Sequence, residues 1–212
     1  MSNNYRIVVL LSGSGTTLQS MIDADLPADI CAVISNKEDV MGLERAQKAG
    51  IASHVLDHTS FSSREAFDEE LKKLIDQQEP DLIVLAGFMR ILSDDFVNHY
   101  YGRLINIHPS LLPKYKGMHT HQRVMDDGEP LHGSSVHFVN TELDAGPVVL
   151  QARVPVLPSD DVDKLELRIK SKEHIIYPTA ISWLAEGRIE LKGNEVYMDQ
   201  KKMSGPVVID YM

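Results

Sequence analysis

The first strand, turn and helix of the chain constrain its fold most strongly. Residues 5–11, Tyr-Arg-Ile-Val-Val-Leu-Leu, form an apolar run, as is typical of a strand that is buried on both faces of a parallel sheet. The run ends in Ser-Gly-Ser-Gly-Thr-Thr at residues 12–17, and Leu18, Met21 and Ile22 follow at helical spacing. A buried strand, a glycine-rich turn and a helix in this order predict an α/β protein.

The same alternation continues to about residue 108. We predict strands at 30–35, 54–56, 81–87 and 104–108, and helices at 40–49, 62–78 and 93–98. This spacing predicts a doubly wound, mostly parallel, Rossmann-like sheet with helices on both faces. Ligands of such sheets bind at the carboxyl ends of the strands. The turn at 13–15, the loop at 88–92 and the strand end at 106–108 all belong to that edge.

The pattern changes after Pro113, where an antiparallel C-terminal extension is expected. We predict a mobile loop at 114–118, a helix to about 126, paired strands at 133–139 and 148–156, a helix at 160–186 and a hairpin at 188–198. Ser159 or Asp160 should cap the long helix. The last twelve or so residues carry no clear pattern, and we expect them to be loose.

Composition excludes several classes of function. The chain has 212 residues and a net charge of −10, which argues against binding to nucleic acid or to an anionic membrane. A single cysteine, Cys31, permits no internal disulfide and indicates a reducing compartment. The sequence shows no signal peptide and no apolar run of membrane-spanning length. We therefore expect a cytoplasmic protein that acts on small molecules, as a monomer or a homodimer.

The turn around Gly13 and Gly15 is a candidate anion site. Backbone N–H groups converge where a glycine-rich turn opens a helix, and the helix dipole favours negative charge there. The turn has no third glycine at dinucleotide spacing and no Gly-Lys-Ser/Thr sequence, so it fits a phosphate cradle in general. The alternative is a tight turn that needs glycine only for its backbone conformation.

Asn106 and His108 are candidate catalytic residues at the end of a strand. Side chains two residues apart in a strand point to the same face. An amide donor and an imidazole there can stabilise an oxyanion and move a proton, or they can simply cap the strand. Asp144 lies among turn-forming residues, where a carboxylate could orient His108 or could only close an Asx turn.

Neither a metal site nor a serine nucleophile is expected. The histidines at 108, 119, 121, 132 and 137 lack a zinc-binding pattern such as His-Glu-x-x-His. The sequence around Ser12 and Ser14 is not a nucleophile elbow. A base and an orienting acid without a protein nucleophile suit a reaction in which the substrate supplies the nucleophile, such as an amine.

Three linked motifs resemble the folate-dependent formyltransferases. They are Asn106-x-His108-Pro-Ser-Leu-Leu-Pro, Gly133-x-Ser-Val-His137 and Leu143-Asp144-x-Gly-Pro. Further similar segments are Ser12-Gly13-x-Gly15, Asn36-Lys37, Gly42-Leu43-x-Arg45-Ala46, Leu85 to Leu92, Glu173-His174 and Tyr177-Pro178. The resemblance covers roughly residues 5–190 and is specific because the motifs occur together.

The resemblance implies transfer of a formyl group from 10-formyltetrahydrofolate to the amine of glycinamide ribonucleotide, as in purine biosynthesis. It assigns Asn106, His108 and Asp144 to catalysis. It assigns the turn with Gly13, Gly15, Thr16 and Thr17 to the substrate phosphate, Glu173 to the ribose and Lys170 to the phosphate. The folate-binding residues that it implies are Arg64, Met89, Arg90, Ile91, Leu92, Asn106, Asn140, Thr141, Glu142, Leu143 and Asp144.

The resemblance also carries expectations about organisation. We expect one domain over 1–212, with a nucleotide-binding half at about 1–100 and a folate and catalytic half at about 101–198. The first strand begins near residue 5, so the regulatory domain that precedes the core in formyltetrahydrofolate hydrolase is not expected. The added domain and basic surface of methionyl-tRNA formyltransferase are not expected either. A non-catalytic nucleotide-binding module would keep the glycine-rich turn without needing Asn106, His108 and Asp144 together.

Overall fold

The computed structural model describes residues 4–211. Two compact units make up the chain, Met1–Asn106 and Ile107–Met212. The predicted single domain, with halves divided near residue 100, stays a prediction.

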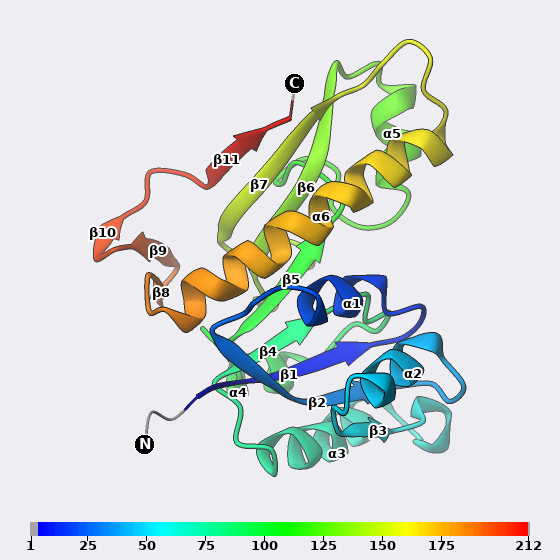
Figure 1. The fold of residues 1–212 in the computed structure, drawn as a ribbon, viewed down its shortest axis with the longest axis vertical. Coiled ribbons are helices and arrows are strands. Elements are labelled where there is room, and N and C mark those ends of the chain that lie inside the picture. The colour runs from blue at the N-terminus through cyan, green and yellow to red at the C-terminus, as the bar shows by residue number, and fades with distance from the viewer. Residues whose placement is uncertain (1–3, 212) are drawn as a thin grey trace. The chain divides into compact units, whose positions relative to one another are not determined.

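The first unit is built on a parallel sheet (Figure 1). Its strands are β1 (Tyr5–Leu11), β2 (Ala28–Ser35), β3 (Ser53–Val55), β4 (Leu82–Leu85) and the start of β5 (Leu104–His108). They lie side by side in the order β5-β4-β1-β2-β3, and every pairing is parallel. Residues 7–11 of β1 are fully buried, as the apolar run at the start of the sequence predicts.

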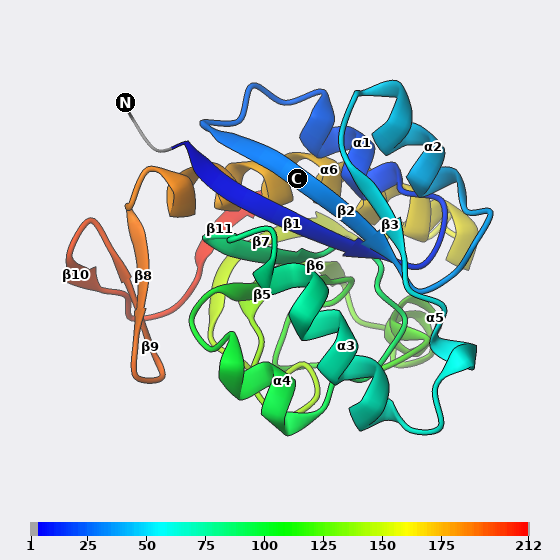
Figure 2. The ribbon, with the colours of Figure 1, turned by 90° about the horizontal axis from the view of Figure 1, so that it is seen from below.

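Helices cover both faces of this sheet. They are α1 (Thr16–Ile22), α2 (Met41–Lys48), the short 3₁₀ helix η1 (His58–Ser60), α3 (Arg64–Asp76) and α4 (Asp94–His99). Figure 2 shows α1 and α2 on one side of β1, β2 and β3, with α3 and α4 on the other side. Ser63 caps α3 by accepting the N–H of Ala66, and Ser93 caps α4 by accepting the N–H of Phe96. The predicted doubly wound, Rossmann-like α/β fold is confirmed.

The second unit combines an antiparallel pair with a long helix. Its elements are α5 (Thr120–Asp126), β6 (Leu131–Phe138), β7 (Val148–Pro155), α6 (Val162–Ala185), β8 (Ile189–Lys192), β9 (Glu195–Met198), β10 (Lys201–Lys202) and β11 (Val207–Asp210). β6 pairs antiparallel with β7, and β8, β9 and β10 form a small antiparallel sheet. The predicted antiparallel extension is thus confirmed. Helix α6 lies along β6 and β7 (Figure 1) and contributes Leu165 and Ile169 to a buried cluster with Val154 of β7.

Two sequence-based expectations for this unit are wrong. Residues 207–210, expected to be loose, form β11, which pairs in parallel with β7. Branched apolar residues favour a strand there, and Arg153 of β7 donates two hydrogen bonds to the Asp210 carboxylate. The cap of α6 is Asp161, which accepts the N–H of Lys164. Asp160 instead pairs with Arg168 at 2.6 Å.

Within residues 4–211, no helix is both long enough and apolar enough to cross a membrane.

Candidate active site

His108 and Asp144 form a buried pair in the second unit. His108 ends β5, and its Nδ1 atom lies 3.3 Å from Oδ2 of Asp144. The side chains are only 8% and 10% exposed. On the other side of the ring, the Nε2 atom lies 2.9 Å from the carbonyl oxygen of Tyr115. A carbonyl only accepts hydrogen bonds, so Nε2 carries a proton and donates. A second proton on Nδ1 would make the ring a cation facing a carboxylate.

The loop that holds Asp144 is tightly specified. Asp144 has a positive φ of 47°, a conformation that aspartate tolerates better than most residues. Its Oδ2 atom accepts the N–H of Gly117 at 2.9 Å. A Cβ atom on Gly146 would lie 1.8 Å from the carbonyl oxygen of Phe138, so only glycine fits there. This packing explains the Leu-Asp-x-Gly-Pro motif in structural terms.

His137 is a buried, uncharged neighbour of the Asp144 carboxylate. Its Nδ1–H donates to the carbonyl of Phe138 at 2.8 Å, and Nε2 lies 3.9 Å from Oδ1 of Asp144. Burial lowers the pKa of His137, against smaller opposing effects of that hydrogen bond and of Asp144. His137 therefore stays neutral near neutral pH and adds no positive charge beside Asp144.

Asn106 is the last residue of the first unit and stands two positions before His108 in β5. It lies opposite Leu85 of β4 in the register of the parallel pair. The two-residue spacing within one strand directs the side chains of Asn106 and His108 to the same face.

Buried polar residues that the sequence analysis did not assign hold the loop after His108. Ser135 of β6 donates to the carbonyl of Ser110 at 2.6 Å and accepts the N–H of Leu112 at 3.1 Å. Gln151 of β7 donates to Ser135 and to the carbonyl of Leu112, both at 2.9 Å. One sequence signal is available: Gln151 interrupts the apolar run at 148–152, whereas Ser135 lies in a strand with several polar residues and does not stand out. These contacts fix where β5 ends and the loop begins.

Glu173 and Lys170 lie on α6. Oε1 of Glu173 is 2.8 Å from the hydroxyl of Ser134, which also lies 2.9 Å from the carbonyl oxygen of His108. Burial raises the pKa of Glu173, against smaller opposing effects of Ser134 and Lys170. Glu173 is thus connected to the His108 backbone through a single hydroxyl.

The segment before Asp144 is mostly exposed. Asn140 accepts the N–H of Glu142 through its side chain at 3.1 Å and so closes an Asx turn. Thr141 and Glu142 are exposed, and the Leu143 side chain is 58% exposed. These three side chains therefore face solvent.

In the first unit, the glycine-rich turn is held by α2. Gly15 caps α1 in a left-handed conformation, with a φ of 67°, and Thr16 and Thr17 open the helix. A Cβ on Gly15 would lie 2.5 Å from the Cα of Gly42. Arg45 donates from Nε to the carbonyl of Ser14 at 2.9 Å. The Gly-Leu-x-Arg-Ala motif of α2 therefore serves to pack against the turn.

The loop at 88–92 follows β4 in the same unit. Met89 and Ile91 are 69% and 65% exposed, whereas Leu92 is buried. The Arg90 guanidinium lies over the Phe67 ring, 4.7 Å from its centroid. Arg64, at the start of α3, is 45% exposed and pairs with Glu65 at 3.3 Å.

Two further histidines, His121 and His132, form a pair. Nδ1 of His121 lies 2.9 Å from Nε2 of His132. Burial lowers the pKa of His132 to about 3, with His121 and His108 adding to the effect. His119 instead caps α5 with a φ of 57°. Over the described part of the chain, no three His, Cys, Asp or Glu side chains are grouped so that they could hold a metal ion.

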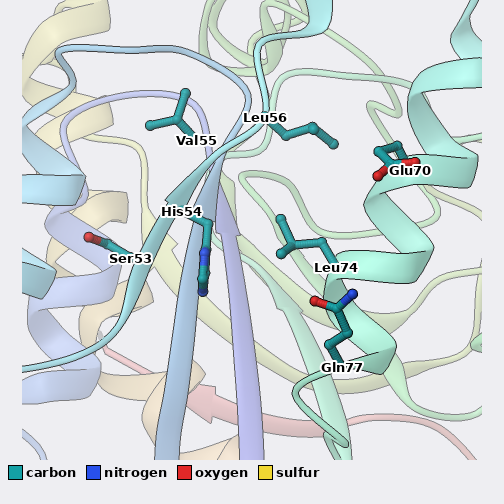
Figure 3. Close-up of a pocket in the computed structure, with 7 residues that line it drawn as sticks. All are labelled: Ser53, His54, Val55, Leu56, Glu70, Leu74 and Gln77. Atoms are coloured by element: carbon teal, nitrogen blue, oxygen red, sulfur yellow. The ribbon is translucent and has the colours of Figure 1, made fainter.

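A cavity of about 440 Å³ lies between β3 and α3 (Figure 3). It is lined by Ser53, His54, Val55, Leu56, Glu70, Leu74 and Gln77. None of these is a predicted site residue, so the cavity is separate from the candidate site.

The comparisons with known proteins agree with the fold. The sequence matches the Formyl transferase family over residues 5–181, and the chain therefore belongs to that family. Within it, the chain is 54% identical over 201 residues to the phosphoribosylglycinamide formyltransferase of Escherichia coli strain K12, covering 93% of this chain and 95% of the relative. It is 46% identical over 202 residues to the protein of that name from Haemophilus influenzae, with coverage of 93% and 95%.

A solved structure supports the same assignment. The phosphoribosylglycinamide formyltransferase of Coxiella burnetii, in complex with CHES, superimposes with a TM-score of 0.93 at 49% identity, covering 97% of this chain and all of that one. The family resemblance of the sequence motifs is thus confirmed.

Proposed function

We propose that the chain transfers the formyl group of 10-formyltetrahydrofolate to the amino group of glycinamide ribonucleotide in purine biosynthesis. The products are formylglycinamide ribonucleotide and tetrahydrofolate. The observation that carries the proposal is the buried pair of His108 and Asp144 at 3.3 Å, in a chain 54% identical to a phosphoribosylglycinamide formyltransferase. Family membership supports a folate-derived formyl donor, and the 10-formyl compound is our specific proposal.

The reaction needs one oxyanion to be stabilised and one proton to be moved. The substrate amine attacks the formyl carbon, and the carbonyl oxygen becomes an oxyanion on a tetrahedral centre. Asn106 donates a side-chain N–H to this oxygen, and His108, in its doubly protonated form, donates from the same face of β5. Asp144 holds the positive charge on the ring. The proton lost by the amine ends on the N10 nitrogen of the folate as the C–N bond breaks.

His108 must turn one ring nitrogen toward the substrate. In the structure, Nε2 donates to Tyr115 and Nδ1 faces Asp144. The carbonyl of Tyr115 belongs to the segment between β5 and α5, which also carries Gly117, the donor to Asp144. A shift of this segment would release Nε2 for the oxyanion while Asp144 keeps Nδ1.

The substrate-binding roles follow the family resemblance. The turn from Gly13 to Thr17 binds the phosphate through backbone N–H groups, Glu173 binds the ribose and Lys170 assists with the phosphate. The loop at 89–92 and the loop at 140–144 bind the folate, and Arg64 binds its carboxylate tail. The roles are supported by the left-handed backbone of Gly15, by the exposed side chains of Met89, Ile91 and Leu143 in the two loops, and by the half-exposed guanidinium of Arg64.

We also propose a cytoplasmic location, which is supported by the single cysteine and by the small-molecule substrates.

One assay tests the function. Purified protein is mixed with 10-formyltetrahydrofolate, with and without glycinamide ribonucleotide, and the deformylated folate is followed by absorbance. Turnover that requires the ribonucleotide, with formylated product identified by mass, is the expected result. Deformylation without the amine would indicate a hydrolase. Binding without turnover would indicate a nucleotide-binding module.

A further inference from the structure

Ser12 opens the glycine-rich motif Ser12-Gly13-x-Gly15, yet its hydroxyl makes no hydrogen bond to the rest of that turn among the described residues. It accepts the backbone N–H of Met89 at 2.8 Å and donates to Oδ1 of Asn36 at 2.5 Å. The backbone N–H of Ser12 also donates to the carbonyl of Gly87 at 3.1 Å. Three contacts thus tie Ser12 to its surroundings, and two of them are to the chain around the loop at 88–92.

The direction of the Ser12 hydroxyl is fixed by Asn36. A hydroxyl has one proton, and giving it to Asn36 leaves only lone pairs for the N–H of Met89. Asn36 follows β2 and is 2% exposed. Nδ1 of His58 lies 2.8 Å from the carbonyl oxygen of Asn36, so the asparagine backbone is itself anchored. Ser12 is 6% exposed, and water therefore competes little for these bonds.

The far end of the same loop is held in the same way. Oδ2 of the buried Asp68 accepts the N–H of Ser93 at 2.6 Å. Between the two anchors, Arg90, Ile91 and Leu92 form no backbone hydrogen bond to any other described residue. A loop fixed at both ends with unpaired backbone between them presents N–H and C=O groups in set positions.

We propose that Ser12 is a positioning residue for the folate-binding loop at 89–92, although it belongs by sequence to the phosphate-binding turn. The inference rests on the proposed function, which assigns the loop to the folate. Ser12 acts through Met89: its oxygen sets where the Met89 N–H lies, and that in turn sets the backbone of Arg90 to Leu92. Asp68 is the second anchor of the loop.

The proposal predicts a selective effect on one ligand. Ser12→Ala removes the acceptor of a buried N–H, and one such lost bond corresponds to about a tenfold change in affinity. Tetrahydrofolate should bind roughly tenfold more weakly to this variant, whereas glycinamide ribonucleotide should bind within about twofold of wild type. Ser12→Thr, which keeps the hydroxyl, should restore most of the folate affinity.

Gly13→Ala provides the matched control at the neighbouring position. A Cβ on Gly13 would meet no atom within 4 Å, and its φ lies outside the left-handed region, so the fold tolerates the change. The added methyl lies on the phosphate-binding turn, and it should weaken glycinamide ribonucleotide and leave tetrahydrofolate nearly unchanged. The two neighbouring variants thus have opposite expected patterns.

The experiment measures the dissociation constant of each ligand by calorimetry, together with kcat and KM. Equal weakening of both ligands by Ser12→Ala, or unchanged folate affinity, overturns the proposal. If Ser12→Ala does not fold, Asp68→Ala tests the same loop from its other end and should again weaken the folate alone. Wild-type protein that binds both ligands without turnover would contradict the proposed function. The effect of Ser12→Ala on the two dissociation constants would still decide whether Ser12 positions the loop. Wild-type protein that does not bind tetrahydrofolate would overturn both.

Discussion

Replacing Asp144 by asparagine removes one charge from the site and little else. Asparagine tolerates the positive φ of 47° at this position. Its amide oxygen can still accept the N–H of Gly117, which lies 2.9 Å from Oδ2 in the wild type. Its amide nitrogen can donate to the unprotonated Nε2 of His137. We therefore expect the melting temperature to change by no more than about 4 °C, the equivalent of about 1 kcal/mol for a chain of this size.

The catalytic loss is expected to be large because the lost charge faces His108 directly. At 3.3 Å and an effective dielectric constant of about 20, a carboxylate attracts an imidazolium by about 5 kcal/mol. Proton transfer by a positioned side chain contributes about 10²- to 10⁴-fold to a rate. A thousandfold loss corresponds to about 4 kcal/mol, within the attraction available from the pair. Asp144→Asn should therefore lower kcat by about 10²- to 10⁴-fold.

The assay is the absorbance of deformylated folate at saturating concentrations of both substrates, with the melting temperature measured on the same preparation. Dissociation constants for glycinamide ribonucleotide and tetrahydrofolate should stay within about threefold of wild type, since a uniform loss of binding is not the expected cause. A folded variant that keeps a third or more of the wild-type kcat would show that Asp144 is only a turn former, and the argument from the 3.3 Å contact would be refuted.

Three further outcomes are expected. Asn106→Ala and His108→Ala should each lower kcat by about 10²- to 10³-fold with modest changes in KM. The double variant should lose less kcat than the product of the two single losses, because both donors serve one oxygen. Effects confined to KM would mean that this strand end only binds substrate. Burial lowers the pKa of His132 to about 3. Below about pH 6.5 the unfolded chain therefore binds a proton at this histidine that the folded chain does not bind. The free energy of unfolding should consequently fall by up to about 1.4 kcal/mol for each pH unit between pH 6 and pH 4. Urea titrations should show that the free energy of unfolding falls less steeply with decreasing pH in His132→Asn than in the wild type, and equal slopes would contradict the lowered pKa of His132. Asp68 and Glu173, whose pKa values are raised, act in the opposite direction in both proteins. Gln151→Leu should lower kcat at least tenfold, because it removes the donor to Ser135 and to the carbonyl of Leu112 and leaves that carbonyl unpaired. An unchanged kcat would mean that Ser135 alone holds the loop after His108.

The sequence predicts the first unit well because its signals are local. An apolar run such as residues 5–11 favours a buried strand whatever its neighbours are, and β1 has the predicted bounds. Ser93 is predicted as a cap because it is a hydroxyl residue directly before a helical pattern. For the helix before it, Ser62 and Ser63 are equal candidates, and the structure selects Ser63. The predicted cap of α6 is wrong because Ser159, Asp160 and Asp161 are three consecutive residues that can each cap a helix. Only the bond between Asp160 and Arg168, two turns along the helix, decides among them.

Features that depend on distant residues could not be predicted from local patterns. Val207, Val208 and Ile209 become a strand because β7 has a free edge to pair with. The contact between His108 and Asp144 joins residues 36 positions apart (144 − 108), and the residue types suggest such a pair without showing that the two side chains meet. The bonds of Ser12 and Gln151 to loops elsewhere in their units have no sequence pattern that would reveal them. Each is a buried polar side chain with a backbone group among its partners, and any residue can supply such a group.

The parallel pairing of β11 with β7 affects how the second unit is made. Val207 lies opposite Leu150, 57 residues earlier in the chain (207 − 150). A ribosome that adds about 5–20 residues per second needs roughly 3–11 s to synthesise that interval. During this time the outer edge of β7 has no strand to pair with, although β6 is already present on its other side. An unpaired strand edge is a template for pairing with other chains. Nascent chains of this protein are therefore most exposed to aggregation in the seconds before Val207 to Asp210 are complete, and changes that delay this segment should lower the soluble yield without altering the finished site.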